Sequence, residues 1–142
     1  MTLGDYYWEV KNLLLLLSVF SSLVVLGYWQ KSRHGKLKKV DGLTISAVEL
    51  NQKLGKKATI VQFSTTFCSE CRTAKAIVKD VVKEFKDITY VEVDAESNLD
   101  LVRRSDIRST PTTIFLNSEG FEIARAKGAP KRDQLIKAIK AI

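Results

Sequence analysis

Residues 63–72, FSTTFCSECR, decide the fold of this 142-residue chain, because they join two regular elements and carry both of its cysteines. The preceding run ATIVQF (58–63) is almost entirely apolar, which is typical of a buried strand. After the second cysteine, apolar residues recur every three or four positions, which predicts a helix over residues 68–85. Cys68 and Cys71 therefore stand where a strand passes into the first turn of a helix.

This position favours thiol chemistry at the Cys-Ser-Glu-Cys motif. The first turn of a helix presents unpaired N–H groups and the positive end of the helix dipole, and both stabilise a thiolate. Arg72 and Lys75 add positive charge nearby, while Glu70 opposes them. We expect Cys68, at the exposed end, to attack a disulfide, and Cys71, three positions on, to resolve the mixed disulfide.

Two other roles of a Cys-x-x-Cys pair are less consistent with the sequence. A zinc site needs four ligands, and His34 is the only histidine, so a second chain would have to supply the other pair. A structural disulfide closing so small a ring restrains little unfolded chain. The sequence therefore predicts no metal and a redox-active pair.

The rest of the chain alternates helices and strands. A capping box at Ser46 and Glu49 predicts a short helix over 46–54, ended by Gly55. Further along the chain, the patterns predict a strand (88–93), a short helix (99–105), a strand after Pro111 (112–116), a turn (117–120), a strand (121–126) and a last helix (130–142). This order predicts an α/β fold with a mixed sheet and helices on both faces.

The first thirty residues (1–30) read as a membrane anchor. Residues 13–29 contain no charge, and Trp8 before them and Trp29 at their end stand where interfacial aromatic residues do. We predict one transmembrane helix over about 12–29, lying in the lipid bilayer. Two alternatives stay open: a cleaved signal peptide, although the leading segment has net charge −1 rather than positive, and a buried core helix, although five successive leucines leave no polar face.

Positive charge is concentrated directly after this anchor. Residues 31–43 form a basic juxtamembrane linker, in which residues 31–39 carry a charge of +5 and would contact anionic lipid headgroups. The positive-inside rule then predicts a single-pass protein of the cell membrane, with its C-terminal domain (44–142) in the cytoplasm. Residues 40–142 have a net charge of only +3 and show no basic stripe with interleaved aromatics, so nucleic acid is not expected as a partner.

From about residue 44 to its end, the chain resembles the thioredoxin family, within a membrane-anchored branch. The motifs that carry the resemblance are IVQFSTTFCSECR, YVEVDAE, IRSTPTTIFLNSEG and GAPKRDQLIKAI. It implies a thioredoxin-like fold, with Cys68 as nucleophile and Cys71 as resolving thiol. It also implies that the enzyme acts on protein thiols and disulfides and needs no cofactor beyond its own redox-active disulfide.

The resemblance assigns further residues to the substrate groove. Pro111 matches a cis-proline whose loop faces the cysteine pair, and Thr110 beside it would hold the substrate chain by backbone bonds. Gly128 matches a glycine that leaves a flat surface beside the groove. Phe67 stands where the family usually has tryptophan, and it can keep the hydrophobic wall without the indole N–H.

Two departures from the family motif concern chemistry. Ser69 and Glu70 replace the usual Gly-Pro pair, and Gln62 stands where the family often buries an acid. Because an amide cannot titrate, proton transfer at Cys71 would use water or another group, with Glu70 as a candidate.

Two alternative functions stay open: a non-enzymatic tethered adaptor that binds partners through the cis-proline groove, and an extracytoplasmic oxidoreductase for secreted proteins or cytochrome maturation.

Overall fold

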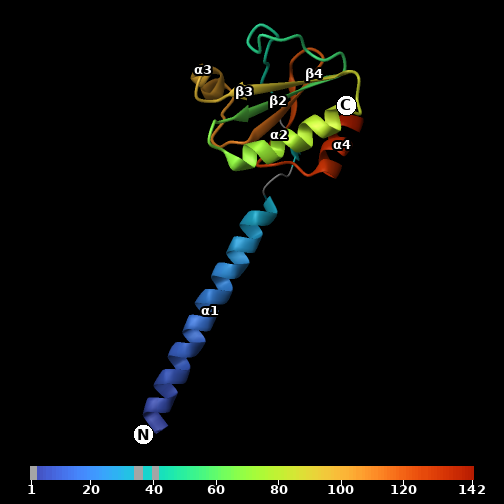
Figure 1. Ribbon diagram of the computed structural model, residues 1–142. Helices are drawn as coiled ribbons and strands as arrows, with labels where there is room; N and C mark the ends of the chain where they lie inside the picture. Colours follow the sequence, from blue (N-terminus) through green and yellow to red (C-terminus); the bar gives the residue numbers. More distant parts are fainter. Residues whose placement is uncertain (1–2, 34–36, 40–41) are drawn as a thin grey trace. The chain divides into compact units, whose positions relative to one another are not determined.

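The N-terminal segment forms one uninterrupted helix in the computed structural model, α1 (Leu3–Arg33), which encloses the predicted span (Figure 1). The structure describes residues 3–33, 37–39 and 42–142. Within α1, Val10–Trp29 has a mean hydropathy of 2.0, and none of it is buried. This length and composition suit a membrane span, and a signal sequence near an N-terminus has the same properties.

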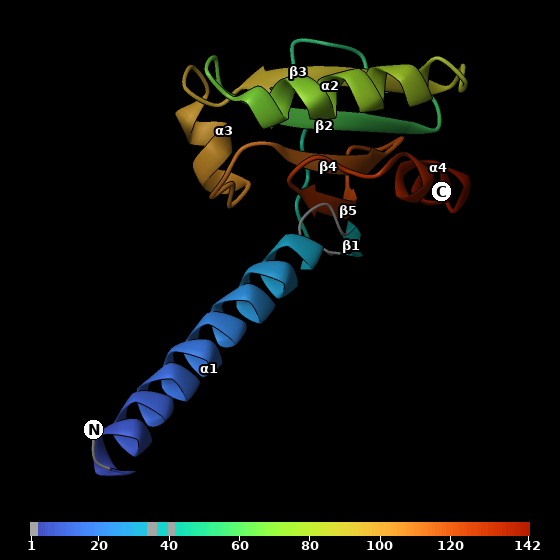
Figure 2. The same cartoon turned by 60° about the horizontal axis from the view of Figure 1, so that its bottom comes forward.

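The remaining residues fold around a five-stranded mixed sheet in the order β1-β5-β4-β2-β3 (Figure 2). Its strands are β1 (Leu37–Lys39), β2 (Ala58–Ser64), β3 (Ile88–Asp94), β4 (Thr112–Asn117) and β5 (Glu122–Lys127). The β2–β3 pair is parallel, and the other three pairs are antiparallel. This arrangement confirms the predicted α/β class and thioredoxin-like architecture.

Helices cover both faces of this sheet because its central strands are apolar on both faces. On one face, Ile60 and Phe115 pack against α2 (Ser69–Val82) and α4 (Arg132–Lys140). On the other, Phe63 and Ile114 pack against Leu101 of α3 (Leu99–Arg104). All seven residues of β2 are buried, so the strand that leads to the cysteines is held from both sides.

The predicted helix over 46–54 is wrong. Its capping box does form, since Glu49 Oε2 accepts a hydrogen bond from the Ser46 amide at 2.9 Å and Ser46 Oγ accepts one from the Glu49 amide at 3.3 Å. Only hydrogen-bonded turns follow, because Asn51 adopts a left-handed φ of +48° that a continuing helix does not allow. The segment instead inserts Ile45 and Leu50 into the core on the α3 face.

Strand β1 lies inside the stretch that the sequence indicated as a linker (31–43). Leu37 pairs with Ala126 and Lys39 with Ala124, which places β1 at the edge of the sheet beside β5. Three residues with two lysines give no periodic signal, so this strand was not predicted. Residues 34–36 and 40–41, and the side chains of 31–39 that were expected to meet lipid headgroups, lie outside the described part of the chain.

Candidate functional site

Cys68 and Cys71 form a disulfide at the N-terminal end of α2, with an S–S distance of 2.11 Å and a Cα–Cα distance of 5.2 Å. Cys68 is the N-cap residue of the helix, and its sulfur accepts a hydrogen bond from the Cys71 amide at 3.0 Å. Cys68 is partly exposed, whereas Cys71 is only 3% exposed. Cys68, at the helix start, is therefore the more accessible of the two cysteines.

Gln62 lies beneath the helix turn that carries Cys71. Its side chain is fully buried, and its Nε2 donates to the carbonyl oxygen of Cys71 at 3.1 Å. Its Oε1 accepts a hydrogen bond from the Tyr90 hydroxyl at 3.2 Å. Burial, with a smaller contribution from the charge of Glu92, raises the pKa of Tyr90, so the phenol keeps its proton and remains a donor. The amide thus fixes the backbone at Cys71.

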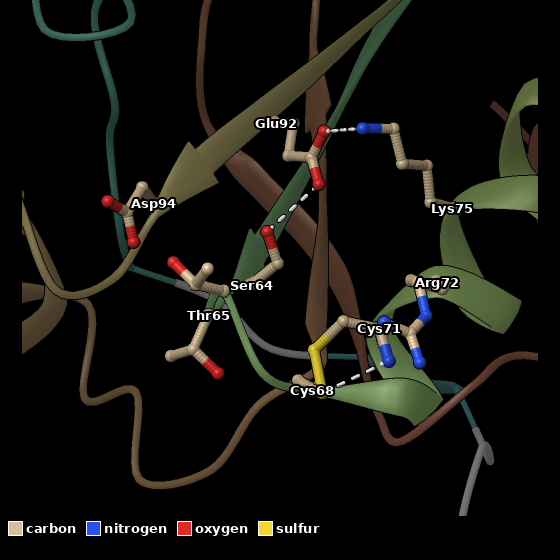
Figure 3. Close-up of a pocket in the computed structure, with 9 residues that line it drawn as sticks. Ser64, Thr65, Cys68, Cys71, Arg72, Lys75, Glu92 and Asp94 are labelled. Carbon is tan, nitrogen blue, oxygen red and sulfur yellow. Dashed lines mark hydrogen bonds and ion pairs between the residues drawn. A yellow bond between two sulfur atoms is a disulfide. The ribbon is translucent and has the colours of Figure 1, made fainter.

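A polar cavity of about 470 Å³ opens beside the disulfide (Figure 3). Both cysteines line it, together with charged side chains of α2 and β3 and hydroxyl groups at the end of β2 and directly after it: Ser64, Thr65, Thr66, Arg72, Lys75, Glu92 and Asp94. Figure 3 shows Glu92 and Lys75 reaching toward each other across the upper part of this space, with the sulfur atoms below. Small hydroxyl side chains after β2 leave this space unfilled.

Glu92 is the acid whose contacts come from other residues that line this cavity. One carboxylate oxygen accepts from Ser64 Oγ at 3.0 Å, and the other lies 2.5 Å from Lys75 Nζ. Asp94 is engaged elsewhere, because it accepts from the hydroxyl of Ser97 and the amide of Glu96. These hydrogen bonds lower the pKa of Asp94. Arg72 lines the cavity from the first turns of α2, as a positively charged neighbour of Cys71.

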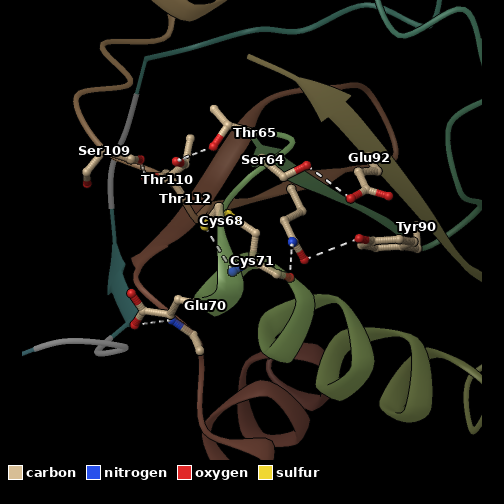
Figure 4. Close-up of a disulfide and its surroundings, with 12 residues drawn as sticks. Ser64, Thr65, Cys68, Glu70, Cys71, Tyr90, Glu92, Ser109, Thr110 and Thr112 are labelled. Carbon is tan, nitrogen blue, oxygen red and sulfur yellow. Dashed lines mark hydrogen bonds between the residues drawn. A yellow bond between two sulfur atoms is a disulfide. The ribbon is translucent and has the colours of Figure 1, made fainter. Parts of the chain in front are cut away.

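On the other side of the disulfide lies the loop before β4. The Thr110–Pro111 peptide bond is cis, in agreement with the expected cis-proline. The hydroxyl of Thr110 lies 3.4 Å from that of Thr65, whose carbonyl oxygen accepts a hydrogen bond from the Cys68 amide (Figure 4). Gly128 adopts a φ of +78° and donates its amide proton to the Pro111 carbonyl at 2.8 Å, so the structure does bring it beside this loop.

Two further residues of the motif face solvent. Phe67 is 93% exposed, which leaves an aromatic ring on the surface directly before Cys68. Glu70 extends toward the loop after β5, where its Oε1 accepts a weak hydrogen bond from the Ala129 amide at 3.5 Å (Figure 4). Glu70 therefore does not line the cavity that contains Cys71, and its expected role in proton transfer there loses support.

Among the site residues that sequence reasoning missed are Ser64, Tyr90 and Glu92. They could have been found from the alternation of side chains along adjacent strands, because Gln62 of β2 is paired with Glu92 of β3 in the parallel register. Among the described residues, no group of three or more histidine, cysteine or acidic side chains is arranged to hold a metal ion. The site offers two thiols, a non-titrating amide beneath them and a charged cavity beside them.

Comparison with known proteins supports this description. Residues 43–141 match the family model described as Thioredoxin. Thioredoxin H5 of Oryza sativa subsp. japonica is 32% identical over 77 residues, which cover 54% of this chain and 56% of that protein. Thioredoxin of Gallus gallus is 28% identical over 106 residues, or 75% of this chain and 98% of that one.

Comparison with solved structures supports the same fold. The crystal structure of thioredoxin NaTrxh from Nicotiana alata aligns with a TM-score of 0.55 at 27% identity, over 61% of this chain and 73% of its own. The match with the family model begins at residue 43, so α1 lies outside the part of the chain that it covers.

Proposed function

The chain belongs to the thioredoxin family and carries the site of a thiol–disulfide oxidoreductase, and from this premise we propose that it reduces protein disulfides while tethered to a membrane by α1. The observation that carries the chemistry is the Cys68–Cys71 disulfide at the start of α2, beside the cis-proline loop. Supporting the tether is the apolar, unburied stretch Val10–Trp29. The partner proteins are identified only by their chemistry, as carriers of accessible disulfides.

In the first step, the thiolate of Cys68 attacks one sulfur of a partner disulfide. A bond forms between Cys68 Sγ and that sulfur, and the partner's second sulfur leaves as a thiolate. The start of α2 stabilises the attacking anion, because the helix dipole and the Cys71 amide both point at Cys68 Sγ. The exposed ring of Phe67 and the loop around Thr110 and Pro111 would support the bound partner chain.

In the second step, Cys71 attacks Cys68 Sγ. The Cys68–Cys71 bond forms, the bond between Cys68 and the partner breaks, and the partner leaves reduced. The Cα–Cα distance of 5.2 Å suits this closure without rearrangement of the helix turn. Electrons from a reductant of the dithiol class then reopen the disulfide for another cycle.

Trapping the mixed disulfide between Cys68 and a partner protein tests this function directly. Without the resolving thiol, the mixed disulfide through Cys68 cannot close, so Cys71→Ala in the full chain should accumulate disulfide-linked partners in cells. These adducts should collapse on treatment with dithiothreitol and be absent from the double variant Cys68→Ser, Cys71→Ala. If the single variant traps no protein while its Cys68 remains reactive, the proposed activity on protein disulfides is wrong.

We further propose that the membrane is the cell membrane and that the thioredoxin domain faces the cytoplasm. The support is the charge asymmetry of the sequence, net −1 before the apolar segment and +5 over residues 31–39. A membrane-impermeant thiol reagent applied to intact cells tests the side. Cys68 should be labelled only after lysis; labelling in intact cells would place the domain outside, and release of the chain by high salt without detergent would contradict the tether.

A further inference from the structure

The second step of the proposed reaction needs a proton acceptor for Cys71. Its thiol must lose a proton before it attacks Cys68, and at 3% exposure it has almost no direct contact with bulk water. Gln62 cannot accept that proton, because an amide does not titrate and both ends of this one are already hydrogen-bonded. The acceptor must therefore be reached through the cavity that Cys71 lines.

The groups that face this cavity leave one candidate. From α2, Arg72 and Lys75 are cations and cannot accept a proton in that form. From β3, Asp94 is held by Ser97 and Glu96 in hydrogen bonds that favour its charged form. Tyr90, beneath the same turn, keeps its proton because burial raises its pKa.

Glu92 is the remaining carboxylate, and the structure orients it. Ser64 fixes one oxygen from β2, at 3.0 Å, while Lys75 fixes the other from α2, at 2.5 Å. Its side chain is 32% exposed, so a proton that it accepts can pass on to solvent. The cavity is polar and open at the surface, and its volume of about 470 Å³ exceeds that of one water molecule many times over.

We propose that Glu92 accepts the proton of Cys71 through water in this cavity, and that Ser64 and Lys75 hold its carboxylate in place for that transfer. The inference rests on the proposed function. As the proton leaves Cys71, its sulfur attacks Cys68 Sγ, and the partner's sulfur departs with the electron pair of the broken bond. The proton on Glu92 then returns to solvent or to the departing thiolate, so the charge balances over the step. Glu92 acts through water and is a positioning residue.

The test isolates the resolving step with a small neutral disulfide, dithiodipyridine, and the reduced full chain in detergent micelles. Attack by Cys68 releases one thiopyridone in a first phase, and closure by Cys71 releases a second in a later phase. At neutral pH, Glu92→Gln should slow the second phase roughly tenfold and leave the rate of the first phase within about twofold of the wild-type rate. The difference between the two second-phase rates should narrow as pH rises, because hydroxide in the solvent then increasingly takes over as the proton acceptor.

Two variants make this result specific to the carboxylate of Glu92. Glu92→Asp keeps an acid in the cavity and should restore the second phase to within about threefold of the wild type. Asp94→Asn removes an equal charge from the same cavity but leaves the proposed proton acceptor in place, so it should not slow the second phase. A role limited to folding would instead slow both phases of Glu92→Gln at every pH.

The sign of the effect separates this proposal from simple electrostatics. Because a nearby negative charge disfavours a thiolate, mere loss of charge in Glu92→Gln would accelerate closure by Cys71. Acceleration, an unchanged second phase, or equal slowing in Asp94→Asn would each overturn the role of Glu92. Absence of any second phase in the wild type would instead overturn the dithiol function itself, so the two failures are distinguishable.

Discussion

The surroundings of the two cysteines differ although only two residues separate them. Cys68 caps a helix, is partly exposed and has the bare ring of Phe67 beside it. Cys71 is buried over Gln62 and meets solvent only along the charged cavity. One sulfur is thus placed for encounter with large partners and the other for closure within the chain. The difference shows how a single helix turn divides a two-step reaction between an open and a sheltered site.

The largest expected effect follows from exchanging the nucleophile. Cys68→Ser in the full chain should lower the rate of the first thiopyridone release by about 10³-fold or more, because the remaining thiol is buried. Cys71→Ser should keep that rate within about threefold and lose only the second release. If Cys68→Ser reacted as fast as the wild type, Cys71 would be open to partners and the contrast between the two sites would fail.

Two phenylalanines sharpen the same contrast between sheltered and open surroundings. Phe63 is fully buried in the core on the α3 face, whereas Phe67, four residues later, is 93% exposed. Phe63→Ala should lower the free energy of unfolding by about 3–5 kcal/mol, through lost burial and the cavity left behind. Phe67→Ala should change it by less than about 0.5 kcal/mol.

Urea denaturation of the full chain in micelles, followed by far-ultraviolet circular dichroism, measures both variants. Phe67→Ala should instead raise the KM for a protein disulfide substrate a few-fold, because its ring lies beside the entry to Cys68. A large loss of stability in Phe67→Ala would show that this ring packs against the domain rather than facing partners.

A substitution of Gln62 tests the buried surroundings of Cys71 alone. Gln62→Ala leaves the buried carbonyl of Cys71 and the hydroxyl of Tyr90 without their partner, so it should cost about 1–3 kcal/mol of unfolding free energy. Gln52→Ala, on the exposed turn after Asn51, is the matched control and should be near neutral. Equal urea midpoints for the two variants would mean that the Gln62 hydrogen bonds do not stabilise the fold around Cys71.

The smallest expected effect is a pH dependence from Tyr90. Because the pKa of this phenol is raised in the folded chain, the unfolded chain loses the proton first as pH rises. The stabilising contribution is therefore complete below about pH 10, the ordinary tyrosine pKa, and declines above it as pH rises toward the folded pKa. Urea midpoints measured between about pH 8 and 11 should fall more steeply for the wild type than for Tyr90→Phe. Parallel curves would contradict a buried, protonated phenol.

The sequence predicted the site where its pattern was local, and failed where chemistry depends on strand register. Cys68 and Cys71 stand in one contiguous motif, and cis-Pro111 was expected from the family resemblance that another contiguous motif carries. The structure places the loop of Pro111 beside the disulfide (Figure 4). The pairing of Gln62 with Tyr90, and of Glu92 with Lys75, requires knowing which residues of β3 lie beside β2 and under α2. No single segment contains that information.

The prediction of helices likewise succeeded where the pattern was local and failed where contacts with the rest of the domain decide the structure. Periodic segments such as α2 and α4 were predicted correctly in kind, with ends shifted by up to three residues. The segment over 46–54 was misread because a capping box reports how a helix turn starts and says nothing of whether it continues. Its continuation depends on Asn51 and on the contacts of Ile45 and Leu50 with the core.

The register of β1 with β5 has a consequence for synthesis. Leu37 pairs with Ala126, so the first strand of the sheet finds its neighbour only when almost the whole domain has been made. Residues of α1 leave the ribosome before all of them, and translation is slow compared with helix formation. We therefore expect the N-terminal helix to be in its final environment before the sheet closes. Until then β1 has no neighbouring strand, so its backbone hydrogen-bonding groups stay unpaired while the rest of the domain is being made.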